Sequence, residues 1–223
     1  MFKRNTLFNI RNPHQAIALA GCAAVLGALQ ANVFHGVGSE RYTYDVEHDD
    51  EITSNFIGLA FIVTTEEYTF SALHQVLRIP DRAPVFKREY SNHMYTISAY
   101  YCAALAAALT TSWIYPLSAG GVGYYWFAFE DRSFTDFLFY EAGLMATCLA
   151  GNFFGFMFGC MFTEQVTALA MIQLFNMSFN FGAGCWVNIG KGASPPVRFF
   201  SWISPVRYGI ELTMRRVTAG KHL

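Results

Sequence analysis

Two adjacent carboxylates, Glu66 and Glu67, stand inside a long apolar run, in the stretch FIVTTEEYTF at residues 61–70. A charge at the centre of a bilayer costs about 2.5–3.5 kcal/mol on insertion scales, so each carboxylate needs a partner, water or a proton. Successive helical residues point about 100° apart, so the two side chains cannot face the same surroundings. We therefore expect Glu66 and Glu67 to face different surroundings, a polar cavity or a partner helix rather than lipid.

A second group of polar side chains lies in the last apolar run. Gln173, Asn176 and Asn180 are spaced at i, i+3 and i+7, which places them on one face of a helix. Amides are costly in hydrocarbon, so this face should point into a bundle or a cavity. Hydrogen bonding between helices and the wall of a cavity are two compatible interpretations of the stripe.

Other arrangements that could do chemistry are weak. The stretch DVEHDDE at 45–51 has carboxylates for a cation but lacks the glycine and spacing of a calcium loop, so a solvated acidic loop is the simpler interpretation. The histidines show no i, i+4 pairing, and we predict no metal site. The sequence holds no Ser/His/Asp or Cys/His arrangement and no G-x-x-x-x-G-K-[ST] loop, so we expect neither enzyme activity nor a cofactor in this chain. The cysteines lie in apolar runs without CxxC spacing, which is typical of buried apolar side chains and not of disulfides.

The composition of the chain indicates whether it folds in water or in a lipid bilayer. The chain has 223 residues, of which 53% are hydrophobic and 14% are charged, whereas soluble domains carry about 25% charged residues. The net charge of −1 gives no reason to expect nucleic acid as a partner. Apolar runs of about 18 residues or more can cross a bilayer, and only helices satisfy their own backbone there. The sequence therefore predicts an all-α, multi-pass integral membrane protein.

We predict five membrane-spanning helices and one connecting helix, forming one transmembrane domain over residues 1–223. The spans cover about residues 16–34, 54–76, 112–129, 137–162 and 166–189. The helical stretch that begins at Tyr95 should lie at the membrane interface first and continue into the third span after a break at Pro116. Residues 77–94 would form a charged loop, and residues 190–223 an outer segment.

Orientation follows from the positions of lysine and arginine. Seven basic residues lie before the first span and in the 77–94 loop, against two in the short loops on the opposite side: Lys3, Arg4, Arg11, Arg78, Arg82, Lys87 and Arg88 against Arg41 and Arg132. The positive-inside rule therefore places the N-terminus and residues 77–94 on the cytosolic or matrix side. The basic residues of 190–223 oppose this assignment, and the side of that segment stays open. The basic, acid-free N-terminus fits a cytosolic flank or a mitochondrial presequence, so the membrane can be plasma or organellar, including the mitochondrial inner membrane.

The fourth predicted span carries small residues every four positions. They are Gly143, Thr147, Gly151, Gly155 and Gly159. Small residues at this spacing let the backbone of another helix approach closely. We therefore expect this face to pack against a helix, of the same chain or of another.

Three longer stretches resemble one known family. The family is the G subfamily of ABC transporters, the White and pleiotropic-drug type. Its coupling loop resembles PVFKREYSNHMYTISAYYCA, and its second span resembles NFIGLAFIVTTEEYTFSAL. The segment after its fifth span resembles SWISPVRYGIELTM. The resemblance covers nearly the whole chain and implies an ABC-2 type transmembrane domain. In that family six helices form one half, and two halves surround a central cavity.

The resemblance implies roles for several residues. The substrate cavity would be lined by Glu67, Phe70, Gln173, Met177 and Asn180. With Glu67 toward this wet, protein-lined space, Glu66 would face a neighbouring helix, with a partner such as Gln173 or a water. The 77–94 loop would touch a nucleotide-binding domain through Lys87, Arg88 and Glu89. An apolar plug at the outer end of the fifth span would consist of Cys185 and Trp186.

The chain also departs from the family. A nucleotide-binding domain, a sixth span and cysteines in the outer segment are not found in it, and the family usually has neutral residues at Glu66 and Glu67. We therefore expect a truncated domain that works as an exporter subunit for a lipid, sterol or other amphipathic substrate. Its partners would be membrane lipid, a second membrane domain in a homo- or heterodimer, and an ATPase domain or subunit that binds ATP and magnesium. The alternatives are a transporter-derived structural subunit of a larger membrane complex and a truncated product without a function of its own.

Overall fold

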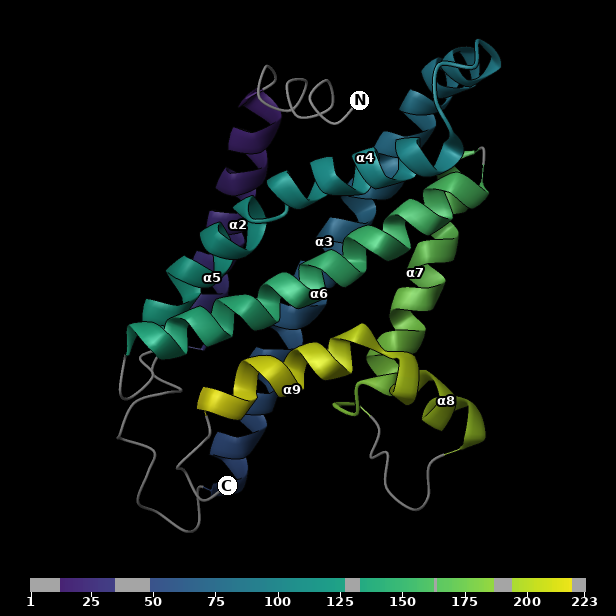
Figure 1. The fold of residues 1–223 in the computed structure, drawn as a ribbon. Helices are drawn as coiled ribbons and strands as arrows, with labels where there is room; N and C mark the ends of the chain where they lie inside the picture. Colours follow the sequence, from purple (N-terminus) through teal and green to yellow (C-terminus); the bar gives the residue numbers. More distant parts are fainter. Residues whose placement is uncertain (1–12, 35–48, 127–132, 163, 187–193, 218–223) are drawn as a thin grey trace.

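A computed structural model describes residues 13–34, 49–126, 133–162, 164–186 and 194–217 (Figure 1). Its helices are α2 (Pro13–Val33), α3 (Asp49–Ser91), α4 (Ile97–Thr111), α5 (Ile114–Trp126), α6 (Phe134–Met161), α7 (Gln165–Gly182), α8 (Pro195–Ile203) and α9 (Pro205–Val217). No strand occurs in these ranges. The predicted all-α fold is therefore confirmed for the part of the chain that the structure describes.

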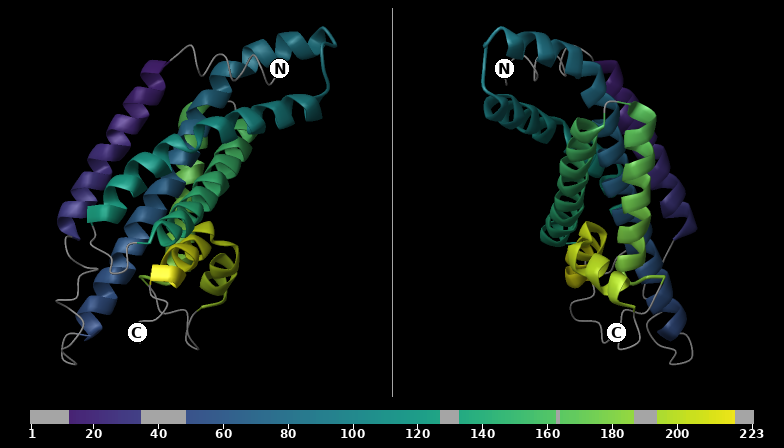
Figure 2. Two further views of the ribbon diagram at one scale, coloured as in Figure 1. Left: turned by 60° about the vertical axis from the view of Figure 1, so that its left-hand side comes forward. Right: turned by 90° about the vertical axis from the view of Figure 1, so that its right-hand side faces the viewer.

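The helices form a bundle, and further helices lie at each of its two ends. Helices α2, α5, α6 and α7 and the first part of α3 extend between the two ends (Figure 1). Helix α4 and the last turns of α3 lie at one end, whereas α8 and α9 lie at the other (Figure 2). Within the bundle α2 packs on α5, α6 packs on α3 and α9, and α7 packs on α3 and α8.

Two described stretches are long and apolar enough to cross a membrane. They are Ile97–Tyr124, which takes α4 and α5 together across their break, and Phe134–Met161. The apolar part of α2, Ala20–Val33, is shorter. The number of five spans therefore stays a prediction, although the helices occur where the apolar runs place them.

The break between α4 and α5 lies at Ser112 and Trp113, just before the position expected from Pro116. Pro116 falls in the first turn of α5, where a helix has no intrahelical partner for the missing N–H. The side chain of Ser112 donates to the carbonyl of Ala108 at 2.7 Å and closes α4. The proline thus opens the second helix rather than ending the first.

Residues 77–94 differ from the expected loop, because α3 continues through them as far as Ser91. The helix ends in a Schellman-type turn, in which the amide of His93 donates to Tyr90 and that of Met94 donates to Glu89. His93 has a φ of 52°, a conformation that glycine usually adopts at this position. Only residues 92–96 connect α3 to α4.

Aromatic contacts explain why the prolines at 80 and 84 do not end α3. Phe86 stacks on Tyr90 at 5.8 Å and packs against Tyr100 of α4 at 4.4 Å between ring centroids. Tyr95, in the connection, lies 5.9 Å from Tyr100. These contacts join the end of α3 to α4, so tertiary packing outweighs the local signal for a loop.

The small-residue face of α6 packs closely against neighbouring helices. A side chain at Gly151 would meet the backbone carbonyl of Tyr68, and one at Gly155 would meet that of Ala72. At the other end of α6, a side chain at Gly143 would meet Thr213 of α9. The predicted close packing is confirmed, and the partners are α3 and α9 of the same chain.

The motif SPVRYGIE joins the two C-terminal helices to the bundle. Ser204 precedes α9, accepts from the amide of Arg207 at 3.3 Å and donates to the carbonyl of Phe179 in α7 at 2.9 Å. Arg207 donates to the hydroxyl of Ser201 in α8. A side chain at Gly209 would meet Thr147 of α6. Ser204, Arg207 and Gly209 therefore connect α9 and its first turn to α7, α8 and α6, respectively.

Candidate functional site

Two buried carboxylates lie between α3 and α6. Glu67 is 1% exposed and Glu141 is 6% exposed, and the two groups interact electrostatically. Neither carboxylate oxygen of Glu67, nor Oε1 of Glu141, has a hydrogen-bond partner among the described residues. Glu141 was not among the predicted site residues, although a single carboxylate near the start of an apolar run gives the same signal as Glu66 and Glu67.

Glu66 points away from this pair. The side-chain amide of Gln30 in α2 donates to Oε2 of Glu66. The prediction that Glu66 faces a neighbouring helix is therefore confirmed. Its partner is Gln30 and not Gln173, because this face of α3 is turned toward α2.

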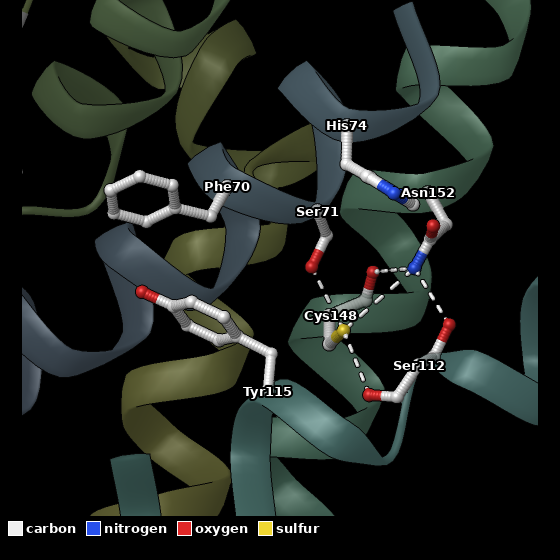
Figure 3. Close-up of a pocket in the computed structure, with 7 residues that line it drawn as sticks. All are labelled: Phe70, Ser71, His74, Ser112, Tyr115, Cys148 and Asn152. Carbon is white, nitrogen blue, oxygen red and sulfur yellow. Dashed lines mark hydrogen bonds between the residues drawn. The ribbon is translucent and has the colours of Figure 1, made fainter. Parts of the chain in front are cut away.

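A hydrogen-bonded network lies beside the acid pair, between α3, the α4–α5 break and α6 (Figure 3). Asn152 is its centre: its amide nitrogen donates to the hydroxyl of Ser112 at 2.9 Å, and its oxygen accepts from Gln75 at 2.8 Å. Ser71 and the thiol of Cys148 are 2.8 Å apart. The network was not predicted, because each of its residues is unremarkable in the sequence by itself.

The network borders a small cavity. Its volume is about 20 Å³, which is enough for one water molecule. The lining residues are Phe70, Ser71, His74, Ser112, Tyr115, Cys148 and Asn152 (Figure 3). The cavity is too small for an amphipathic substrate, so it belongs to the packing of the bundle.

The amide stripe of α7 faces α3. Asn176 donates to the hydroxyl of Thr69 at 2.7 Å, and Thr65 donates to Oδ1 of Asn180 at 3.3 Å. Gln173 is exposed and accepts from Asn176 at 3.4 Å. The structure therefore confirms hydrogen bonding between the helices for Asn176 and Asn180.

Glu67 and the amide stripe are not brought together. Two residues along a helix correspond to a rotation of about 200°, so Glu67 lies nearly opposite Thr65 on α3. Thr65 meets α7, whereas Glu67 is buried on the side of α6. The expected polar space shared by Glu67, Gln173 and Asn180 is therefore not formed within this single chain.

The other residues predicted for the substrate cavity lie on the surface of the chain. Phe70 is 37% exposed and packs on Tyr115 with 5.4 Å between ring centroids. Met177 of α7 is 62% exposed. Both side chains are thus accessible to a second membrane domain, and their contact with substrate at such an interface stays a prediction.

A larger open hollow lies where α3 begins and α7 ends. Its volume is about 610 Å³, and it is lined by Ser54, Ile57, Gly58, Phe61, Ile62, Gly184, Cys185 and Trp186. Trp186 contacts Phe61 edge to face, with 6.0 Å between ring centroids. The two residues predicted to form the plug therefore border this hollow, and none of the five predicted cavity residues does.

The predicted coupling residues lie at the far end of α3. Lys87 and Arg88 are exposed, whereas Glu89 accepts a hydrogen bond of 2.8 Å from the hydroxyl of Tyr95. Nearer the bundle, burial and the charge of Arg82 lower the pKa of Arg78 to about 10, so Arg78 is positively charged at neutral pH. The end of α3 is thus a basic helix held in place by the start of α4.

Comparison with known proteins assigns the family. The sequence profile described as ABC-2 type transporter matches residues 1–215. A relative from Arabidopsis thaliana, ABC transporter G family member 25, is 24% identical over 132 residues. That alignment covers 59% of this chain and 20% of the relative, so the chain corresponds to a limited part of the longer protein. Because the family profile covers nearly all of the sequence, the chain belongs to the ABC-2 type transporter family as one of its membrane domains.

Proposed function

We propose that this protein is the membrane-spanning subunit of an ABC-type exporter that moves a lipid, sterol or other amphipathic substrate. ATPase domains on another chain, which bind ATP and magnesium, would drive it. The observation that carries the proposal is the continuity of α3 from Asp49 to Ser91. One helix holds the exposed basic residues at one end and the contacts with α6 and α7 further along.

The end of α3 is joined to α4 by contacts that would transmit a movement. Glu89 is bonded to Tyr95, and Phe86 packs on Tyr100 of α4. Helix α4 in turn leads into α5 after a break of two residues. A protein that pushes on Lys87 and Arg88 would therefore move α3 and the α4–α5 pair together.

The surface of α7 supports a second membrane domain as partner. Gln173 is exposed and Met177 is 62% exposed, on the same face of the helix. An amide that faces lipid is costly, so a second copy or a related domain would cover it. The cavity between two such faces would combine apolar side chains with amides, which suits amphipathic molecules and gives Gln173, Met177, Asn180 and Phe70 their proposed contact with substrate. Cys185 and Trp186 would then close its outer end.

The test begins with isolation of the tagged chain in mild detergent and identification of the proteins that accompany it. We expect an ATPase subunit, and ATP-dependent movement of a fluorescent lipid after the complex is reconstituted in vesicles. The variant Lys87→Glu/Arg88→Glu should abolish substrate-stimulated ATP hydrolysis while substrate binding persists. Arg198→Glu, an exposed charge reversal in α8 at the opposite end, serves as the control.

Two results would contradict the proposal. Isolation of a large complex that contains no ATPase would favour the structural role. If Arg198→Glu reduced substrate-stimulated ATP hydrolysis as much as the double variant did, the effect would come from charge reversal anywhere on the chain and not from the end of α3.

A further inference from the structure

We infer that Glu67 and Glu141 form a proton-binding site, a buried acid pair between α3, α5 and α6 that holds at least one proton in the packed bundle. The proposal concerns the interior of this chain and does not depend on its activity in transport. It is based on burial, missing partners, the neighbouring charges and the space around the two side chains.

If both carboxylates were ionised, no hydrogen-bond donor or positive charge among the described residues would offset the cost of burying them. Moving one ion into a protein interior costs several kcal/mol even after relaxation, in order of magnitude. The groups that act electrostatically on Glu67 in the described part of the chain are Glu141 and Glu66, which are both acids. Both oxygens of Glu67 lack a hydrogen-bond donor among the described residues. A proton on the pair removes one charge and supplies the missing donor.

Tyr115 provides an independent observation. Its side chain is 4% exposed, and its hydroxyl has no hydrogen-bond partner within the described ranges. The ring extends from α5 toward α3 (Figure 3), and the hydroxyl interacts electrostatically with Glu67. A second buried polar group without a partner thus lies within electrostatic range of Glu67, and it carries no positive charge that could offset an ionised carboxylate.

The space around the pair favours a proton over a larger ligand. The carboxylate of Glu141 lies against Gly120 of α5, and a side chain at Gly120 would meet Oε1 of Glu141 and Leu144. Divalent calcium takes about six to eight oxygen ligands and magnesium about six. Among the described residues no group of three or more acidic, histidine or cysteine side chains could hold a metal ion. The pair is thus a tight site with few ligands.

In the described part of the chain, the titratable groups around the pair supply no positive charge. Those that interact with the pair or with its tyrosine neighbours are Cys22 of α2, Glu66 of α3, Tyr115 and Tyr124 of α5, and Tyr140 and Cys148 of α6. Helix α9 also packs on α3 and α6, but its Arg207 is turned to Ser201 of α8. Among the described residues, the groups found to interact with the pair or with its tyrosine neighbours therefore include no lysine, arginine or histidine.

Infrared spectroscopy of the purified full chain in lipid vesicles tests the proposal. A protonated carboxyl group absorbs at a frequency distinct from that of a carboxylate. We expect the wild-type protein at neutral pH to show a protonated-carboxyl band that shifts in heavy water. The band should change in Glu67→Gln and in Glu141→Gln, disappear in the double variant, and persist in Glu66→Gln.

The wild-type spectrum alone can overturn the inference, so the test does not require that every variant folds. Absence of the band at neutral pH would refute a bound proton. A band that appears only after sodium and potassium are removed would show that a monovalent cation occupies the site instead. Persistence of the full band in the double variant would place the proton on another residue.

Discussion

The hydroxyl of Tyr95 donates a 2.8 Å hydrogen bond to Oε2 of Glu89, across the turn between α3 and α4. This bond and the ring contact of Tyr95 with Tyr100 hold the two helices together at the end of the bundle. The pair therefore sets the orientation of the basic residues beside it.

Tyr95→Phe should loosen this end of α3 without unfolding the bundle. The ring is kept and one hydrogen bond is lost, which costs about 0.5–1.5 kcal/mol. Hydrogen exchange followed by mass spectrometry should show faster exchange at residues 89–96. Tyr90→Phe is the matched control, because Tyr90 stacks on the same Phe86 and is 45% exposed. Equal effects of the two changes would contradict a specific role of the bond to Glu89.

Gly155→Ala should destabilise the fold strongly. The added methyl group would meet the backbone carbonyl of Ala72, which cannot rotate away, and overpacking of this kind costs about 1–3 kcal/mol. Thermal unfolding in detergent measures the change. Gly21→Ala in α2 is the control, since nothing lies within 4 Å of the added atom. Because α3 belongs to the same chain, the larger Gly155→Leu should affect folding first and any assembly only as a consequence.

Gln30→Leu should leave Glu66 without its partner in α2. Loss of the donor to a partly buried carboxylate costs about 1–3 kcal/mol. Asn32→Leu is the control, because the side chain of Asn32 is exposed and donates to Ala28 of its own helix. Replacing both Gln30 and Glu66 by leucine should restore most of the stability, since no polar group is then left without a partner. Failure of this double variant to recover would mean that the bond is not the source of the effect.

Ser204→Ala should destabilise the start of α9. Ser204 is 0% exposed, caps the amide of Arg207 and donates to the carbonyl of Phe179. Loss of a helix cap costs about 0.5–2 kcal/mol, which unfolding by heat would detect. Ser194→Ala is a matched control, because Ser194 precedes α8 without a side-chain capping bond. A similar change in both variants would show that the capping geometry is unimportant.

Local patterns predicted the helices well, and the reason is the strength of the apolar signal. The expected span at 137–162 corresponds to α6 at Phe134–Met161, and the glycines at 151 and 155 identify its packing face. The prediction failed at 77–94, where a charged stretch between two spans was expected to be a loop and α3 instead continues to Ser91. There, the contacts of Phe86 with the tyrosines of the next helix sustain α3, and such contacts between separate helices are not visible in a local pattern.

The candidate site was predictable only in part. Glu66 and Glu67 stand out because charge is rare in apolar runs, and the 100° divergence correctly separates their surroundings. The approach of Glu141 to Glu67 depends on how far α6 is shifted along α3, and a repeat every four residues permits several such shifts. The network around Asn152 depends on that same register. Sequence therefore indicated the faces, whereas packing determined which residues meet.

The order of synthesis adds a consequence to the two-sided packing of α6. Helix α3 emerges from the ribosome before α6, whereas α9, which places Thr213 against Gly143 and Gly209 against Thr147, emerges after it. Until then, that end of α6 presents bare backbone and a row of small residues to lipid or to the insertion machinery. A nascent chain that stalls at this stage keeps this surface uncovered, and the exposed surface would distinguish it from a chain in which α9 has packed on α6.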